Sequence, residues 1–517
     1  MPGNLSAAAA DGGAAHKVTT AMNAYQAARQ LFVSTVTDFL SAQDGGATMA
    51  ALVDHDLLPV LTCPLVKDPI MGIQIGSLNA LGELARQNAE ASHEICVCGI
   101  LDEMVASLSH QNRQIRAAAN TALQNVARHD RSCAQSVVDH GVLEPVRKQL
   151  GTLDVMVKET AVKTLDVLVE KGPDFADLVA DESTIGTCVS HLYMPEDAAP
   201  QTMRTCIALF LANTANHNEW LAQRVVTSEA LHAIASLLGA RSTKPTLRAA
   251  CLKMLSQVAK HSTELAALVV EQNVMPTVLQ CLTNEDHTHT RLAAASLVQE
   301  VSRRTPDLAQ VVASGGGCTC LVRNVELASA GAASVAAILS MGHIAGMHAK
   351  VAKQLLDSDA SRQLILALDC PDPVVKGAAG WTVEQIASHG KDTAGQMSQE
   401  GLLVALEPVY RLCPDGETKT KLKGALKAII KECRSHTDLE PLVKHDTPPD
   451  VQRHVLQAFV DLLPKDVAAR RSFVTSGALM RLQALDLVAG LDARSLDCIQ
   501  EINAQFPEDV VNYYKPK

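Results

Sequence analysis

Residues 84–105 read LARQNAEASHEICVCGILDEMV, and residues 126–146 read VARHDRSCAQSVVDHGVLEPV. The two stretches share one order of features: an apolar helix end, a polar junction, an amphipathic segment, a glycine and a second apolar run. Their glycines, Gly99 and Gly141, lie 42 residues apart. This likeness indicates an internal repeat.

The repeat continues along most of the chain. The junction residue at His129 has equivalents at intervals of 42 to 46 residues, namely Gln87, Lys171, His217, His261, Arg304, Met347, His389 and Glu432. LVDHDLL at Leu52 indicates an earlier copy with its junction near Asp44. A period of roughly 40–47 residues is typical of armadillo and HEAT repeats, whose stacked helices bury their apolar faces against one another.

Each repeat contains a short helix, a glycine, a second short helix, a polar loop and a longer third helix, which favours armadillo over HEAT. Only 3% of residues are aromatic while 47% are hydrophobic, which suits a core of closely packed helices. The predicted fold is an all-α, armadillo-repeat, right-handed superhelical solenoid. We expect a flexible Ala/Gly-rich tail over residues 1–20, an N-terminal capping helix over 21–45, about nine repeats over 46–440 and a C-terminal helical cap over 441–517.

Two recurring residue types have structural roles in this scheme. Gly99, Gly141, Gly316 and Gly401 each lie twelve residues after a junction, where a helix must turn and a positive φ costs glycine little. A histidine at the junction, as at His129, can bond carbonyls at a helix end. Histidines of successive repeats should lie about 10 Å apart, which is too far for shared metal ligation.

No motif indicates catalysis. The glycine-rich stretch at 314–317 lacks the lysine of a phosphate-binding loop. The pairs Cys96/Cys98, Cys318/Cys320 and His287/His289 lie in different repeats, whereas structural zinc needs such pairs close together. We therefore predict no enzyme, no catalytic residue, no cofactor and no metal.

Net charge, cysteine content and the lack of long apolar runs indicate which partners and which cellular compartment to expect. The net charge of −11 argues against nucleic acid as a partner. Fourteen cysteines without a disulfide-rich pattern favour a reducing compartment. Neither a signal peptide nor an apolar run of membrane-spanning length is evident, so we expect a cytoplasmic protein that does not enter a membrane.

The third helices of an armadillo superhelix line its concave face, the usual site for an extended partner. Importin-type proteins carry there a ladder of Trp and Asn, and Trp381 with Gln385 is the one comparable pair in this sequence. Polar residues of the other repeats predict either a groove for one protein partner or a merely hydrated surface. The candidate groove residues are Asn125, Asn213, Gln257, Glu300, His343, Trp381 and Gln385.

A basic helix follows Glu417. Lysines spaced by four form one stripe, while Leu422, Leu426, Ile429 and Ile430 take the opposite face. The stripe predicts either an ordinary solvated face or contact with an acidic protein such as a tubulin tail. Its candidate docking residues are Lys419, Lys423, Lys427, Lys431 and Arg434.

Several segments resemble the sperm-associated antigen 6 family, the armadillo proteins of the flagellar central apparatus. They are AYQAARQLFVSTVTDFL from Ala24, LKMLSQVAKHSTELAALVVEQNVMPTVLQCL from Leu252, VSRRTPDLAQVVASGG from Val301, ARRSFVTSGALMRLQAL from Ala469 and INAQFPEDVVNYY from Ile502. The last two resemble family segments that are not repeats.

The resemblance implies a structural scaffold of the central apparatus of motile cilia and flagella, docked on a central-pair microtubule and organising its projections for motility. Implied partners are tubulin, other central-apparatus proteins and further copies of the chain, and the implied location is the cytoplasm, cytoskeleton and flagellar axoneme. The alternative is a soluble armadillo adaptor for protein transport that binds cargo as importins do.

Overall fold

The computed structural model describes residues 5–41, 61–284, 286–485 and 493–515. Within these ranges every regular element is a helix, which confirms the predicted all-α class. The early repeat expected around Asp44 and Leu52 lies outside the described residues. The chain divides into an N-terminal unit, Met1–Ser236, and a C-terminal unit, Leu237–Lys517, and the division falls within α16 (Ala230–Gly239).

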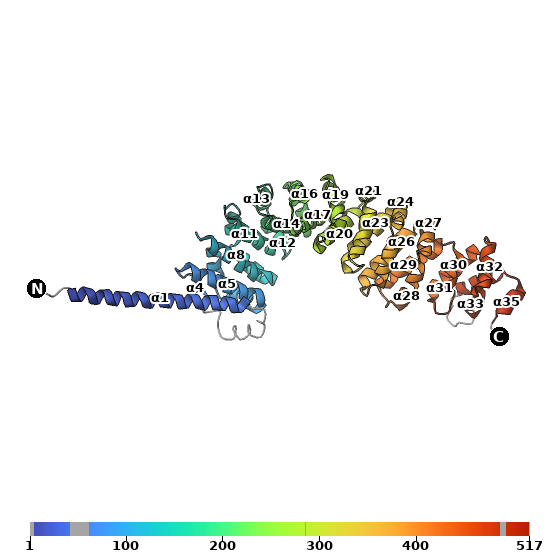
Figure 1. The fold of residues 1–517 in the computed structure, drawn as a ribbon, viewed down its shortest axis with the longest axis horizontal. Coiled ribbons are helices and arrows are strands. Elements are labelled where there is room, and N and C mark those ends of the chain that lie inside the picture. Colours follow the sequence, from blue (N-terminus) through green and yellow to red (C-terminus); the bar gives the residue numbers. More distant parts are fainter. Residues whose placement is uncertain (1–4, 42–60, 285, 486–492, 516–517) are drawn as a thin grey trace. The chain divides into compact units, whose positions relative to one another are not determined.

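In the N-terminal unit the long third helices form an inner row in which each packs against the next (Figure 1). They are α5 (Met71–Gln87), α8 (Arg113–Arg128), α11 (Val155–Val169) and α14 (Gln201–Asn216). The shorter first and second helices are α4 (Cys63–Val66), α6 (Ala89–Val97), α7 (Leu101–Ser107), α9 (Arg131–Asp139), α10 (Leu143–Leu150), α12 (Pro173–Val179), α13 (Glu182–Leu192) and α15 (Glu219–Thr227).

The C-terminal unit repeats this arrangement. Its third helices, again packed in chain order, are α17 (Pro245–Ala259), α20 (Thr288–Ser302), α23 (Val335–Met347), α26 (Pro373–Ala387), α29 (Glu417–Glu432), α31 (Pro449–Leu462) and α34 (Ala493–Asn503). The remaining helices are α18 (Thr263–Glu271), α19 (Met275–Asn284), α21 (Pro306–Ser314), α22 (Gly317–Leu327), η1 (Ala332–Ser334), α24 (Ala349–Asp357), α25 (Ala360–Asp369), α27 (Lys391–Gln399), α28 (Leu402–Leu412), α30 (His436–Leu439), η2 (Glu440–Leu442), α32 (Val467–Thr475), α33 (Ala478–Leu485) and α35 (Glu508–Tyr514).

The polar junction begins the first helix of each repeat. In five repeats the residue after the junction residue is an N-cap whose side chain accepts a hydrogen bond from a backbone N–H of the first turn, as Asp130 does from Cys133 at 2.8 Å and Asn218 does from Leu221 at 2.8 Å. At Gly172, His348 and Gly390 the N-cap position has no side-chain hydrogen bond. Such a cap satisfies an N–H that has no partner within the helix. The recurring polar junction is therefore a helix start signal.

The turn between the first and second helices adopts the left-handed conformation, as the glycine spacing predicts. Gly99, Gly141, Gly316 and Gly401 have φ values of 77°, 82°, 83° and 89°. The same position is left-handed in three repeats that lack the glycine, at Glu229, Asn273 and Asp359 with φ values of 64°, 54° and 69°. The tertiary packing thus imposes this turn even on residues with a side chain.

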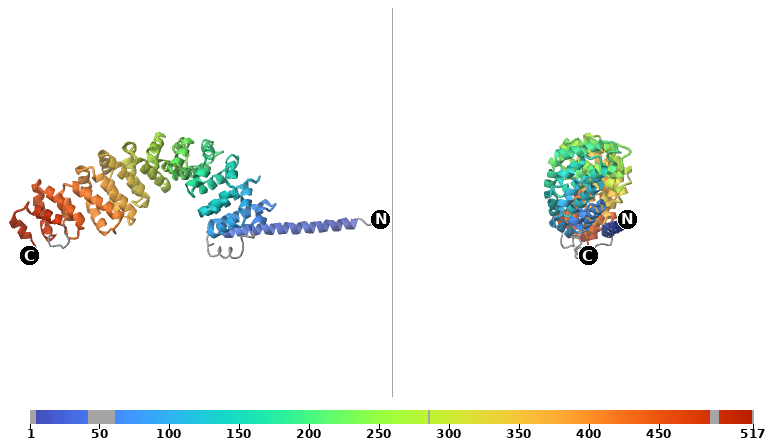
Figure 2. Two further views of the ribbon diagram at one scale, coloured as in Figure 1. Left: turned by 180° about the vertical axis from the view of Figure 1, so that it is seen from behind. Right: turned by 90° about the vertical axis from the view of Figure 1, so that its left-hand side faces the viewer.

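The N-terminus differs from the prediction. Helix α1 (Leu5–Ser41) already includes residues 5–20, which the sequence predicts as a flexible tail. Alanine has the highest helix propensity, so an alanine-rich segment can continue a helix that begins further along the chain. The first part of α1 extends beyond the other helices of its unit (Figure 2), while Val33 and Leu40 are buried where α1 packs on α5.

The C-terminal region also differs from the prediction of a cap unlike the repeats. Helices α32, α33 and α34 follow the order of a repeat, and Gly477 between the first two has a φ of 77°. The preceding repeat is shortened, since α30 and η2 contain four and three residues. Because of this shortening the last repeat does not follow the regular period, and the sequence spacing does not predict it.

No single helix among the described residues is both long and apolar enough to cross a membrane. Helices α18 and α19 meet that criterion only when taken together, with a bend of 86° between them.

Candidate partner-binding surfaces

Junction side chains connect neighbouring third helices. His217 Nε2 lies 2.8 Å from the carbonyl oxygen of Val169, and His129 and His389 make the same kind of contact with Ala85 and Ala345. The predicted bond to a helix-end carbonyl is thus confirmed, although the carbonyl belongs to the preceding repeat. These imidazoles have a structural role between repeats.

Two predicted groove residues lie in the N-terminal unit, and both are buried. Asn125 on α8 donates from Nδ2 to the carbonyl oxygen of Gly82 at 2.9 Å. Asn213 on α14 donates from Nδ2 to Asp166 Oδ1 at 2.9 Å and to Glu170 Oε1 at 3.1 Å. Both amides therefore hydrogen-bond the preceding third helix, whereas the sequence predicts at these positions either a groove for a protein partner or a hydrated surface.

The other five predicted groove residues lie on successive third helices of the C-terminal unit, and all are half-buried. Gln257 is on α17, Glu300 on α20, His343 on α23, and Trp381 with Gln385 on α26. The Oε1 atom of Gln257 is buried, and the described residues offer it no hydrogen-bond partner. This row combines polar groups with two aromatic rings.

Trp381 and His343 pack against each other in this row. Their rings lie 4.7 Å apart at an angle of 60°. Trp381 rests against Gly342 of α23, where any side chain would collide with the indole. Burial lowers the pKa of His343, and the nearby Arg303 guanidinium lowers it further. We call His343, Trp381, Arg303 and Glu300 the Trp381 cluster.

Glu300 and Arg303 give the Trp381 cluster its charge. Glu300 Oε2 lies 2.6 Å from Arg303 and 3.8 Å from Arg304. The Glu300 side chain is 19% exposed, whereas that of Arg303 is 39% exposed. Arg303, which sequence reasoning missed, therefore places a cation beside an aromatic ring system. Such an arrangement fits an extended peptide with acidic and apolar side chains.

The basic stripe on α29 is built as the sequence predicts. Its apolar face, Leu422, Leu426, Ile429 and Ile430, is buried. Its lysines, however, divide into two groups.

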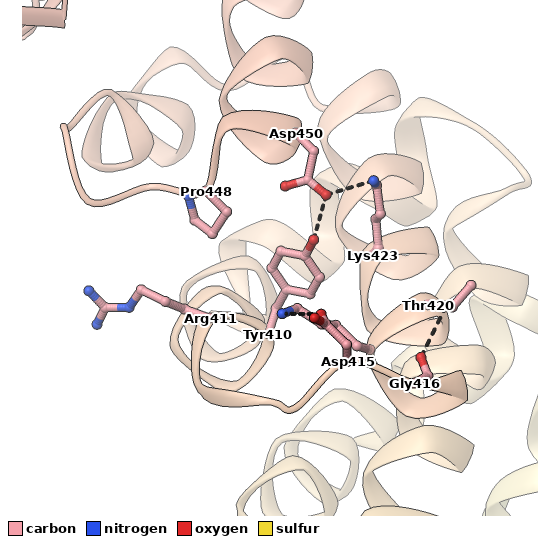
Figure 3. A pocket seen from close by; sticks show the side chains of 9 residues that line it. Tyr410, Arg411, Asp415, Gly416, Thr420, Lys423, Pro448 and Asp450 are labelled. Carbon is pink, nitrogen blue, oxygen red and sulfur yellow. Dashed lines mark hydrogen bonds and ion pairs between the residues drawn. The ribbon is translucent and has the colours of Figure 1, made fainter. Parts of the chain in front are cut away.

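Lys419 and Lys423 line a pocket of about 460 Å³ with Tyr410, Asp415 and Asp450 (Figure 3). Lys419 Nζ lies 2.8 Å from Asp415 Oδ1, and Lys423 Nζ lies 2.6 Å from Asp450 Oδ2. Tyr410 donates its hydroxyl to the same Asp450 oxygen at 2.5 Å. Both lysines are therefore half-buried and held by carboxylates of the protein.

The pKa values of this pocket follow from those contacts. Burial would raise the pKa of Asp450, but hydrogen bonds from Lys423 and Tyr410 outweigh it and hold that pKa below its usual range. Burial and the Asp450 carboxylate raise the pKa of Tyr410. The pocket thus contains an ionised carboxylate that stabilises a neutral phenol and a charged lysine, an arrangement that joins α28, α29 and α31.

The other three basic residues of the stripe, Lys427, Lys431 and Arg434, are exposed. Lys431 lies 3.6 Å from Glu432, and Arg434 donates only to backbone carbonyls within the described residues. We call these three residues the basic end. It is the part of the predicted stripe whose charge is available to a partner.

No family model matches the chain. Over 147 residues it is 35% identical to sperm-associated antigen 6 of Homo sapiens, and over 148 residues it is 34% identical to sperm-associated antigen 6 of Mus musculus. Each match covers 28% of this chain and 28% of the relative. The matched stretch therefore spans less than a third of these curated relatives.

Solved structures show a likeness over more of the chain. An engineered protein aligns with a TM-score of 0.64 and 17% identity over 86% of this chain and 97% of its own length, which shows a shared fold. A designed armadillo repeat protein aligns with a TM-score of 0.43 and 17% identity over 47% of this chain and 99% of its own. The three-helix repeats and this shared fold show that the chain is an armadillo-repeat solenoid, and a stretch of 147 residues in it is similar to sperm-associated antigen 6.

Proposed function

We propose that the chain is a non-enzymatic scaffold in the central apparatus of motile flagella, where it docks on a central-pair microtubule and organises the projections. The observation that carries the proposal is the sequence shared with sperm-associated antigen 6. The armadillo fold supports it, because stacked repeats offer extended binding surfaces. Partner chains, including further copies of this one, would bind the third-helix faces.

The basic end supports direct docking on the microtubule. The chain carries a net charge of −11, and the tubulin surface is also acidic, so the two molecules repel each other at long range. Charges more than about 8 Å apart are largely screened at physiological salt. A local cluster of cations can therefore dominate at contact, and Lys427, Lys431 and Arg434 form such a cluster.

Charge reversal of the basic end tests this docking. The triple variant Lys427→Glu, Lys431→Glu and Arg434→Glu should reduce co-sedimentation with microtubules at least about tenfold, because each exposed charge contributes up to about 1 kcal/mol. Wild-type binding should also weaken as salt is added. The substitutions avoid Lys419 and Lys423, whose ion pairs contribute to the fold.

A matched control changes the net charge equally. Lys148→Glu, Arg241→Glu and Arg362→Glu reverse three exposed cations on α10, in the turn after α16 and on α25, and this variant should bind as wild type does. Equal binding by the basic-end variant and wild type would show that the basic end does not contact tubulin. Equal losses of microtubule binding in both variants would show that the effect comes from net charge and not from the basic end.

The alternative is an importin-like transport adaptor. A repeated lysine-binding groove requires tryptophans on several third helices, but of the two tryptophans in the chain only Trp381 lies on one, since Trp220 is on α15. We therefore favour the axonemal scaffold.

A further inference from the structure

Four side chains with metal-binding atoms meet between two repeats of the N-terminal unit. His93 and Cys96 lie on α6, and Asp130 and Cys133 lie at the start of α9, which packs against α6. His93 Nε2 lies 2.8 Å from Asp130 Oδ2, and Cys133 Sγ lies 3.7 Å from His93 Nδ1. The Cys96 thiol lies near that of Cys133.

We propose that His93, Cys96, Asp130 and Cys133 bind one zinc ion between these two repeats. Ligand atoms of His93, Asp130 and Cys133 all lie within 4.8 Å of one another. Tetrahedral zinc with bonds of about 2.0–2.3 Å separates its ligand atoms by roughly 3.3–3.8 Å. Rotations of these three side chains bring one atom of each, including one of the two His93 nitrogens, to ligating positions. Cys96 lies outside this group of three, and its side chain must turn toward the ion to complete the tetrahedron.

The donor set selects zinc over the common alternatives. Two thiolates, an imidazole and a carboxylate are ligands that zinc accepts, whereas magnesium and calcium prefer oxygen atoms alone. The ligands occur as two pairs with equal spacing, His93-x-x-Cys96 and Asp130-x-x-Cys133. Sequence reasoning missed them because it compared CxC and HxH pairs and did not align ligands of adjacent repeats.

The surroundings hold the ligands in place. Asp130 Oδ1 accepts the backbone N–H of Cys133 at 2.8 Å, which orients the carboxylate and leaves Oδ2 for the ion. Cys133 is buried, while the His93 side chain is 51% exposed and provides access from solvent. The Lys171 ammonium is close enough to interact with Asp130 and Cys133, so it offsets the negative charge that two thiolates and a carboxylate would leave around zinc.

Zinc at this position would connect the first helices of adjacent repeats. An ion that binds the folded chain and not the unfolded one stabilises the fold in proportion to the logarithm of its concentration. The inference does not depend on the proposed function, since it rests only on these four side chains.

The test uses the full-length chain, reduced and freed of metal. Zinc is titrated against a competing chromophoric chelator, and cobalt(II) is added separately as a spectroscopic probe. We expect one zinc per chain and, with cobalt, the thiolate-to-metal charge-transfer band and the intense visible bands of a tetrahedral site. His93→Ala and Cys96→Ser should each lower zinc affinity at least about tenfold, and both replace residues that are not fully buried.

Cys98→Ser is the matched control, because Cys98 is an exposed cysteine that follows the same helix and lies outside the cluster. It should bind zinc as the wild type does, and circular dichroism without metal should be unchanged in all three variants. The proposal is overturned if the reduced protein binds no zinc, or if His93→Ala and Cys96→Ser retain wild-type affinity. Recovery of a Cys96–Cys133 disulfide together with no zinc binding after reduction would assign the cluster to redox chemistry instead.

Discussion

The left-handed turn between the first and second helices shows how single residues support the repeat. At Gly401 no atom outside the neighbouring residues lies within 4 Å of the place where a Cβ would be, so a side chain there meets open space. The cost of any substitution is therefore confined to the backbone. Glu229, Asn273 and Asp359 show that the fold tolerates this cost in other repeats.

Gly401→Ala should lower the free energy of unfolding by about 1 kcal/mol, because an L-residue in the left-handed region costs roughly 1–2 kcal/mol and alanine recovers part of this through the unfolded chain. The control is Gly395→Ala in the preceding helix, α27, where an added Cβ also meets open space. It should raise stability by about 0.5–1 kcal/mol. Thermal unfolding of both variants measures these two changes in stability. If the unfolding temperatures of both variants shift in the same direction, backbone strain at Gly401 is excluded as the cause.

His343 should make stability depend on pH. Its pKa is lowered in the folded protein, so at a given pH the folded protein binds this proton less than the unfolded chain, whose histidine is protonated below about pH 6.5. Stability is therefore lost as pH falls below that value, and the loss is complete below the lowered pKa. His343→Gln should show a smaller loss on acidification than wild type in urea unfolding at a series of pH values.

The control for this experiment is His16→Gln, which replaces an exposed histidine of α1. Its pH dependence should match that of wild type. An equal reduction in both variants would contradict a specific role for the buried imidazole. Part of the loss should persist in His343→Gln, because burial also lowers the pKa of His191 and His454.

At the scale of elements, the last repeat is held by aromatic side chains. Phe473 on α32 lies 4.8 Å from Phe459 on α31 and 6.0 Å from Phe506, measured between ring centroids. Phe459 and Phe473 are fully buried. Three of the seven phenylalanines in the chain are thus in contact at this repeat.

Phe473→Ala should destabilise the last repeat by about 3–5 kcal/mol, the usual cost of removing a buried phenylalanine. Repeat proteins gain stability mainly from neighbouring contacts, so the loss should remain local. Hydrogen exchange should become faster in α32, α33 and α34 and stay unchanged in α17 and α20. Met480→Ala, at a side chain 53% exposed on α33, should leave all of these rates as in wild type. Uniform acceleration along the chain would contradict a local effect.

Most elements could be predicted from sequence because most repeats carry the same signals: a polar N-cap, a turn twelve residues after the junction and an apolar third helix. The signals failed where a repeat departs from the period, as at the shortened α30 and η2. They also failed at α1, whose alanines resemble a flexible tail in composition.

The candidate surfaces were less predictable than the helices. A sequence periodicity places Asn125 and Asn213 on the third helices but does not show that carbonyl and carboxylate groups one repeat away already bind them. It likewise places Lys423 in the basic stripe without revealing Asp450 on the next third helix. Contacts between repeats decide which polar residues remain available, and such contacts depend on packing geometry.

At the scale of the whole molecule, the proposed role requires the chain to be part of the axoneme. The most direct measurement is the location of a tagged, full-length copy in a flagellated cell, followed into isolated axonemes by immunoelectron microscopy. We predict label along the central pair that remains after detergent extraction of the membrane and matrix. Label in the nucleus with none in the flagellum would contradict the scaffold and favour the transport adaptor.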